Sequence, residues 1–119
     1  PGAWRVPASR RLLEGGGELV LGNHPHVRQP REVYQGREIV YSLGNFCYGG
    51  SRRPENRTII YQLTLRVENG ELAETESEMI PCYVHTGSTV NNYCPAPITD
   101  EEQRKQVLDF MDGSAKSPC

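Results

Sequence analysis

One segment constrains the fold of this chain more than any other. From Thr58 to Val67 apolar side chains recur at every second position, which predicts a β-strand. The apolar face contains Ile59, Tyr61, Leu63, Leu65 and Val67. Glu68-Asn69-Gly70 is typical of a hairpin turn. The run that follows it, through Ile80 and Val84, is more polar and predicts a second strand at a sheet edge, where charges discourage mispairing. The sequence therefore predicts a long β-hairpin.

A second hairpin is predicted nearer the N-terminus. The segment REVYQGREIVYSLG (31–44) contains two runs of β-branched and aromatic residues, separated by Gln35 and by Gly36, which can take the positive φ of a tight turn. ELVLG (18–22) predicts a short strand before it. SLGNFCYGG (42–50) and TGSTVNNYCPAP (86–97) are predicted loops.

Two helices complete the prediction. ASRRLLE (8–14) is a short helical stretch that three glycines then end. Thr99 and Glu102 have the spacing of a capping box for a helix through about Met111, which Gly113 ends. We expect one α/β domain over residues 1–112 and a flexible tail at 113–119. The fold is β-rich, with one short N-terminal and one C-terminal helix.

Composition limits the function classes. The chain has 119 residues, and because only 36% of them are hydrophobic we expect a thin core. The chain begins at Pro1 without Met, so we expect the rest of the core to lie upstream. Net charge is -2 and the basic residues are scattered, which argues against nucleic-acid binding. No apolar run is long enough for a transmembrane helix.

The four cysteines form no CxxC pair, so a structural zinc site is not expected. Two interpretations stay open. The thiols are free and buried, or Cys82 and Cys94, which flank one loop, form a disulfide.

The chemistry of the sequence is concentrated in GNHPHV (22–27). His24 and His26 are two residues apart, and in an extended segment such residues point to the same side. Pro25 restricts its own φ and disfavours a helical conformation at His24, which favours an extended tripeptide. A stiff pair of imidazoles after a strand is suited to metal binding, although an isolated HxH is more often part of a polar loop.

A longer pattern surrounds the two histidines. GNHPHVRQPREVYQGREIVYSLGNF (22–46) resembles the characteristic stretch G-H-H-P-H-V-x-Q-P-x-E-x-Y-x-G-K-x-I-x-Y-S-L-G-N-F of the CapA, or poly-gamma-glutamate capsule biosynthesis, family. The preceding GGGELVLG is similar to the family's GADLVIG. The resemblance covers most of the chain and thins after Val67.

This family resembles the calcineurin-like metallophosphoesterases, and the resemblance implies the C-terminal part of a metallophosphoesterase-like α/β sandwich. It also implies that His24 and His26 match the final G-H-x-H motif, each binding one of two divalent ions, manganese, iron or zinc. Asn23 departs from the pattern, because the family usually carries an additional His there. The superfamily's D-x-H, G-D and G-N-H-[DE] motifs do not occur in these residues.

Further residues are candidates for holding the site in place. Asn23, Gln29, Glu32 and Asn45 are candidates to hydrogen-bond the histidines. Glu32 is equally typical of a solvated strand end, and Asn45 of a turn cap. His85 is interpreted as structural, and Trp4 and Tyr93 as packing residues.

The resemblance implies a role in poly-gamma-glutamate capsule biosynthesis, with metal-dependent phosphoesterase-type hydrolysis by the complete protein. The alternatives are a non-catalytic accessory or scaffold role in capsule assembly and export, and a β-rich interaction module. Two imidazoles cannot complete two metal sites, so we expect these 119 residues alone to be inactive. Expected partners are the upstream part of the same domain and capsule-synthesis membrane proteins, in an extracytoplasmic, membrane-associated setting through an N-terminal segment.

Overall fold

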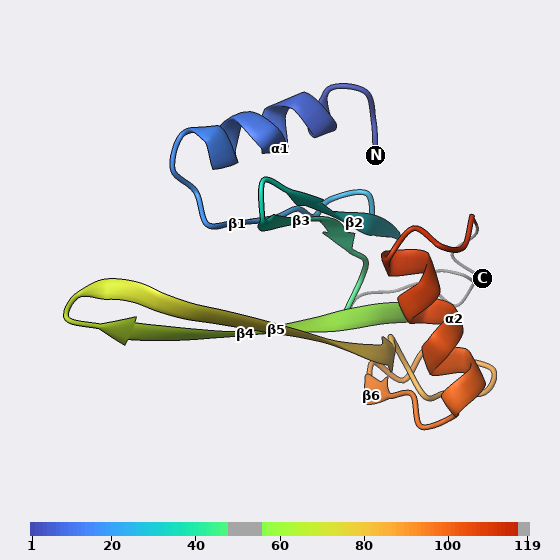
Figure 1. The fold of residues 1–119 in the computed structure, drawn as a ribbon. Coiled ribbons are helices and arrows are strands. Elements are labelled where there is room, and N and C mark those ends of the chain that lie inside the picture. Colours follow the sequence, from blue (N-terminus) through green and yellow to red (C-terminus); the bar gives the residue numbers. More distant parts are fainter. Residues whose placement is uncertain (48–55, 117–119) are drawn as a thin grey trace.

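The computed structural model describes residues 1–47 and 56–116 and contains two small sheets and two helices (Figure 1). The predicted β-rich fold with one helix near each end is confirmed. The elements in chain order are α1 (Arg5–Glu14), β1 (Leu19–Leu21), β2 (Arg28–Tyr34), β3 (Arg37–Leu43), β4 (Arg57–Glu68), β5 (Glu71–Tyr83), β6 (Ala96–Pro97) and α2 (Glu101–Met111).

The first sheet has the order β1-β3-β2. The β2–β3 hairpin is confirmed, with Gln35 and Gly36 both at positive φ (52° and 78°). β1 lies on the other side of β3 and runs parallel to it, so β3 is the central strand. Gly22 extends this pairing, since its N–H donates to the Val40 carbonyl at 2.7 Å. A Cβ at position 22 would lie 2.3 Å from the Tyr41 carbonyl oxygen, so only glycine fits there.

The second sheet has the order β4-β5-β6, and the predicted long hairpin is confirmed, with its turn at Asn69 and Gly70. β5 lies in the middle of this sheet, but it pairs with β6 only at Cys82 and Tyr83. Its remaining length is an edge, as expected. The predicted apolar face of β4 is covered only near the base of the hairpin, because Leu65 is 53% exposed and Val67 is 61% exposed.

Helix α1 begins three residues earlier than predicted. Pro7 lies in its first turn, where a missing N–H costs no hydrogen bond, so the proline does not delay the helix. α1 ends at Gly15 as predicted. Leu13 is buried and packs with Ile39 and Tyr41 of β3, which places the helix over one face of the first sheet (Figure 1).

Helix α2 begins one residue later than the predicted cap implies. Asp100, not Thr99, is the N-cap, and its carboxylate accepts a hydrogen bond from the Gln103 N–H at 2.9 Å. Gly113, at a φ of 76°, follows the helix as predicted. The predicted tail starts with residues that the structure places against α2: the Ser114 N–H donates to the Asp109 carbonyl, and Ala115 packs on the core. Residues 117–119 lie outside the described residues.

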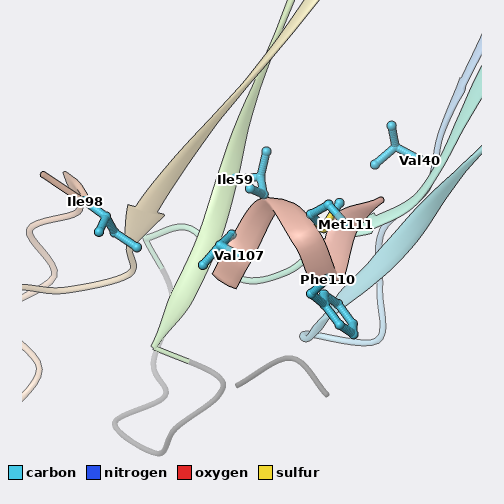
Figure 2. Packing of buried hydrophobic residues seen from close by; sticks show 6 residues of the cluster. All are labelled: Val40, Ile59, Ile98, Val107, Phe110 and Met111. Atoms are coloured by element: carbon cyan, nitrogen blue, oxygen red, sulfur yellow. The ribbon is translucent and has the colours of Figure 1, made fainter. Parts of the chain in front are cut away.

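The main core joins both sheets to α2 (Figure 2). It contains Val40, Ile59, Ile98, Val107, Phe110 and Met111. Polar groups at the rim also join the two sheets. Glu38 of β3 accepts hydrogen bonds from the Tyr61 hydroxyl and from the Ser77 hydroxyl (2.7 Å) and forms an ion pair with Arg31. The first sheet is therefore packed between α1 and this shared core.

The described cysteines are free thiols. Cys82 is buried and its thiol donates to the Ile80 carbonyl, while Cys94 and Cys47 are exposed. The free-thiol interpretation therefore applies to Cys82 and Cys94, although only Cys82 is buried. Cys119 and part of the predicted 42–50 loop lie outside the described residues.

Candidate functional site

The two candidate metal ligands lie on the loop that leads from β1 to β2. Because β1 and β2 flank β3, this short loop must cross the C-terminal end of the central strand. The crossing bends the backbone sharply, with φ of 92° at His24 and 60° at His26. The prediction of an extended His-Pro-His was therefore wrong, because the crossing, and not the restriction that Pro25 imposes, decides the conformation.

The bent loop still brings the imidazoles together. The ring centroids of His24 and His26 are 6.0 Å apart with an interplanar angle of 52°, and both side chains are exposed. They line a hollow of about 340 Å³ at the end of β3. The hollow is lined by Asn23, His24, His26, Gly44, Asn45 and Phe46.

Asn45 is the candidate that contacts a histidine side chain. Its Oδ1 lies 2.6 Å from Nδ1 of His26. If Nδ1 carries the proton, this hydrogen bond fixes the tautomer in which Nε2 has the lone pair, which is how a ligating imidazole is commonly oriented. Asn23 acts locally instead, since its Oδ1 accepts a hydrogen bond from the His24 N–H at 2.9 Å.

Gln29 and Glu32 have other partners in the described structure. Gln29 Oε1 accepts from Arg5 at 3.1 Å, and Glu32 accepts from Arg10 (2.6 Å) and from the Tyr41 hydroxyl (2.6 Å). The hydrogen bond from Tyr41 is the main cause that lowers the pKa of Glu32 below its usual value. These contacts join β2 to α1 and β3, and a role in orienting the histidines stays a prediction.

Two imidazoles with one oriented by an amide suit a zinc or iron site in part. Among residues 1–47 and 56–116 no group of three or more His, Cys, Asp or Glu side chains lies close enough to hold a metal ion. The described residues therefore offer two neighbouring imidazoles, and a metal site would need further ligands from elsewhere. His85 is not among the residues that line the hollow and is only 6% exposed, in agreement with its structural interpretation.

Three residues near the histidines were not predicted from the sequence. Gly44 and Phe46 line the hollow, and Arg28, directly after the loop, is 2% exposed with its guanidinium 5.4 Å from the centre of the Phe110 ring. The sequence signal for Gly44 and Phe46 was their position beside Asn45, directly after a predicted strand. A buried arginine has no local signal, because its burial comes from contact with α2.

Known proteins match this part of the chain. The model of the bacterial capsule synthesis protein family PGA_cap matches residues 1–49, which contain β1 to β3 and both histidines. The PGA biosynthesis protein CapA of Bacillus subtilis is 30% identical over 102 residues, and the capsule biosynthesis protein CapA of Bacillus anthracis is 29% identical over 101 residues. The chain is therefore similar to the bacterial capsule synthesis protein family PGA_cap over residues 1–49 and to two CapA proteins over most of its length.

These alignments cover 84% and 83% of the chain but only 24% and 22% of the two CapA proteins. The chain therefore spans about a quarter of their length. In the part of the chain that the structure describes, neither helix is long and apolar enough to cross a membrane.

Proposed function

We propose that the protein containing this chain acts in the biosynthesis of a poly-gamma-glutamate capsule and that His24 and His26 contribute to a metal site in it. The observation that carries the proposal is the position of the histidines: the family match covers the loop at the end of the central strand where the two rings meet. The proposed role in capsule biosynthesis is supported by the names of the two similar Bacillus proteins.

We further propose that the complete protein is a metal-dependent hydrolase of the phosphoesterase type with two ions of manganese, iron or zinc. When bound, such ions polarise a phosphoryl oxygen and lower the pKa of a bound water. The contribution of this chain is to hold two imidazoles at the rim of an open hollow, with Asn45 fixing the ring of His26. The exposed hollow leaves room for a substrate to approach.

The alternative is a non-catalytic accessory role in capsule assembly and export. It is favoured by the absence, among the described residues, of any carboxylate grouped with the two histidines. Fold ancestry alone does not decide between these roles. In either case the extracytoplasmic, membrane-associated setting and the membrane partners are part of the proposal.

The test uses the natural polypeptide that contains residues 1–119. We expect His24→Ala and His26→Ala to lower the metal content measured by elemental analysis and to abolish the hydrolysis of a generic phosphodiester. Gln35→Ala is the matched control, because Gln35 is also exposed and at positive φ in the same sheet. Metal binding without turnover would support the accessory role, and wild-type metal content in both histidine variants would refute the metal site.

A further inference from the structure

Two arginine side chains are buried in the described part of the chain. Arg28 is 2% exposed and Arg57 is 8% exposed, whereas Trp4 and Tyr93 are 70% and 62% exposed. The interpretation of the two aromatic residues as packing residues was therefore wrong for the described residues. Because the removal of a guanidinium from water is costly, a buried arginine has to be stabilised by its surroundings. The surroundings of Arg28 join it to the candidate site.

Arg28 lies on the pair of the β2–β3 ladder that is nearest to the histidine loop. β2 begins at Arg28, which pairs with Leu43, the last residue of β3. Two residues further along the same register, His26 comes opposite Asn45. The 2.6 Å contact between His26 Nδ1 and Asn45 Oδ1 is found at this position. The contact is therefore an extension of the ladder, and the pair of Arg28 with Leu43 is its base.

The side chain of Arg28 connects this extension to helix α2. Gly44, the residue before Asn45, has a φ of 83°, and a Cβ added to it would lie 3.2 Å from Cγ of Arg28. The arginine stem therefore lies directly against the backbone that leads to Asn45. The guanidinium is 5.4 Å from the centre of the Phe110 ring, which projects from the last turn of α2 (Figure 2). Phe110 is 6% exposed, and the attraction between a cation and an aromatic ring is stronger where water is excluded.

We propose that Arg28 is a positioning residue for the candidate site. Its packing between Gly44 and α2 holds Asn45 where it can orient the ring of His26. An amide oxygen only accepts hydrogen bonds, so this contact selects the tautomer with the proton on Nδ1 and the lone pair on Nε2. If Asn45 moved away, the other tautomer would become populated. The functional meaning of this arrangement rests on the proposed metal role of His26, because the orientation of a ligating imidazole affects metal affinity.

The imidazole of His26 reports the position of Asn45. Long-range proton–nitrogen NMR spectra of the metal-free natural polypeptide, labelled on histidine, distinguish the two tautomers at about pH 8, where an ordinary imidazole is neutral. We expect one His26 tautomer in the wild type, with the proton on Nδ1. Asn45→Ala should populate the second tautomer, and so should Arg28→Met, which removes the guanidinium. Arg28→Lys should restore most of the wild-type population, because an ammonium can also lie over the Phe110 ring.

Arg57→Met is the matched control. Arg57 is also buried and contacts α2, since its Nη2 donates to Gln103 Oε1 at 3.1 Å, but it lies at the start of β4 in the other sheet. We expect both arginine-to-methionine variants to lower Tm. Only Arg28→Met should change the His26 tautomer and weaken zinc binding, measured by isothermal titration, by about tenfold. If Arg28→Met does not fold, Phe110→Leu, which removes the aromatic face and keeps the arginine, should show the same change of tautomer.

Three results would overturn the proposal. The first is an unchanged His26 tautomer in folded Arg28→Met or, if that variant does not fold, in Phe110→Leu. The second is an equal change of tautomer in Arg57→Met, and the third is a mixture of tautomers already in the wild type. Because the tautomer is measured in metal-free protein, a wild type that binds no zinc would refute the proposed metal site without altering this result.

Discussion

Strands β3 and β5 show two ways in which this chain stabilises a strand. In β3 four consecutive residues, from Ile39 to Ser42, are buried, because α1 covers one face and the shared core covers the other. In β5 the eight residues from Glu71 to Glu78 are exposed, and that part of the strand is held by its pairing with β4 and by the tight turn. The histidine loop crosses the end of this buried strand, so the candidate site adjoins a strand that is packed on both faces.

The end of the family match also separates the region that contains β3 from the region that contains β5. It covers residues 1–49, which contain the first sheet and the loop, whereas the β4–β5 hairpin lies beyond it. Because the histidine loop adjoins the buried strand β3, substitutions in the first sheet should affect both the stability of the fold and the candidate site. Substitutions in the outer half of the hairpin should affect neither strongly.

The largest difference is expected between two apolar residues. Ile39→Ala removes a fully buried side chain and should lower the free energy of unfolding by about 3 kcal/mol, through lost burial and a cavity. Leu65→Ala, at a 53% exposed position of the hairpin, should cost less than about 1 kcal/mol. Urea denaturation of both variants measures the difference. Similar losses would show that the hairpin is buried in the natural protein.

An intermediate effect is expected where the two regions meet, at Glu38. Partial burial alone would raise the pKa of Glu38, but hydrogen bonds from Tyr61 and Ser77 and the Arg31 guanidinium outweigh it and hold the pKa below its usual value. Glu38→Gln should therefore lower the free energy of unfolding at pH 7 by about 2 kcal/mol. Glu76→Gln, on the exposed part of β5, should change it by less than about 0.5 kcal/mol.

The same carboxylate predicts a pH dependence. Because its pKa is lower in the folded state, the contribution of Glu38 is complete above the unfolded pKa of about 4.5 and is lost as the pH falls through the folded value. Between pH 7 and pH 3 the wild type should lose more stability than Glu38→Gln does. If the free energy of unfolding of the two proteins changed with pH in parallel, Glu38 would not stabilise the contact between the two sheets.

The smallest difference between the two regions is expected at the two hairpin turns. Gly36 and Gly70 both have positive φ, and a Cβ added at either position would have no atom within 4 Å, so alanine there meets only backbone strain. Each substitution should cost about 1 kcal/mol, measured by thermal denaturation. A much larger cost for Gly36→Ala would mean that the first hairpin tolerates strain less well than the second.

Local signals predicted most of the elements. The alternation from Thr58 to Val67 and the Gln35-Gly36 and Asn69-Gly70 turns depend on neighbouring residues alone, and both hairpins were confirmed. The start of α1 and the cap of α2 were missed by a few residues, because Pro7 is tolerated in a first turn and Asp100 competes with Thr99 for the cap. The parallel pairing of β1 with β3 depends on contacts distant in sequence and was not predicted.

The candidate site was predictable in composition but not in shape. The sequence pattern identified His24, His26 and Asn45, and the structure brings the three together. The sequence pattern did not show that the loop crosses the end of β3, because this crossing follows from the order of the strands in the sheet. For the same reason Gln29 and Glu32, close to the histidines in sequence, have their described contacts with α1 and β3.

The backbone conformation of His24 and His26 has a consequence for the stability of this loop. At positive φ a residue other than glycine is strained, by about 1 kcal/mol or more, so glycine at either position would be easier to fold. On the proposed metal role, the strain at His24 and His26 is a local loss of stability that accompanies the placement of two imidazoles in one loop.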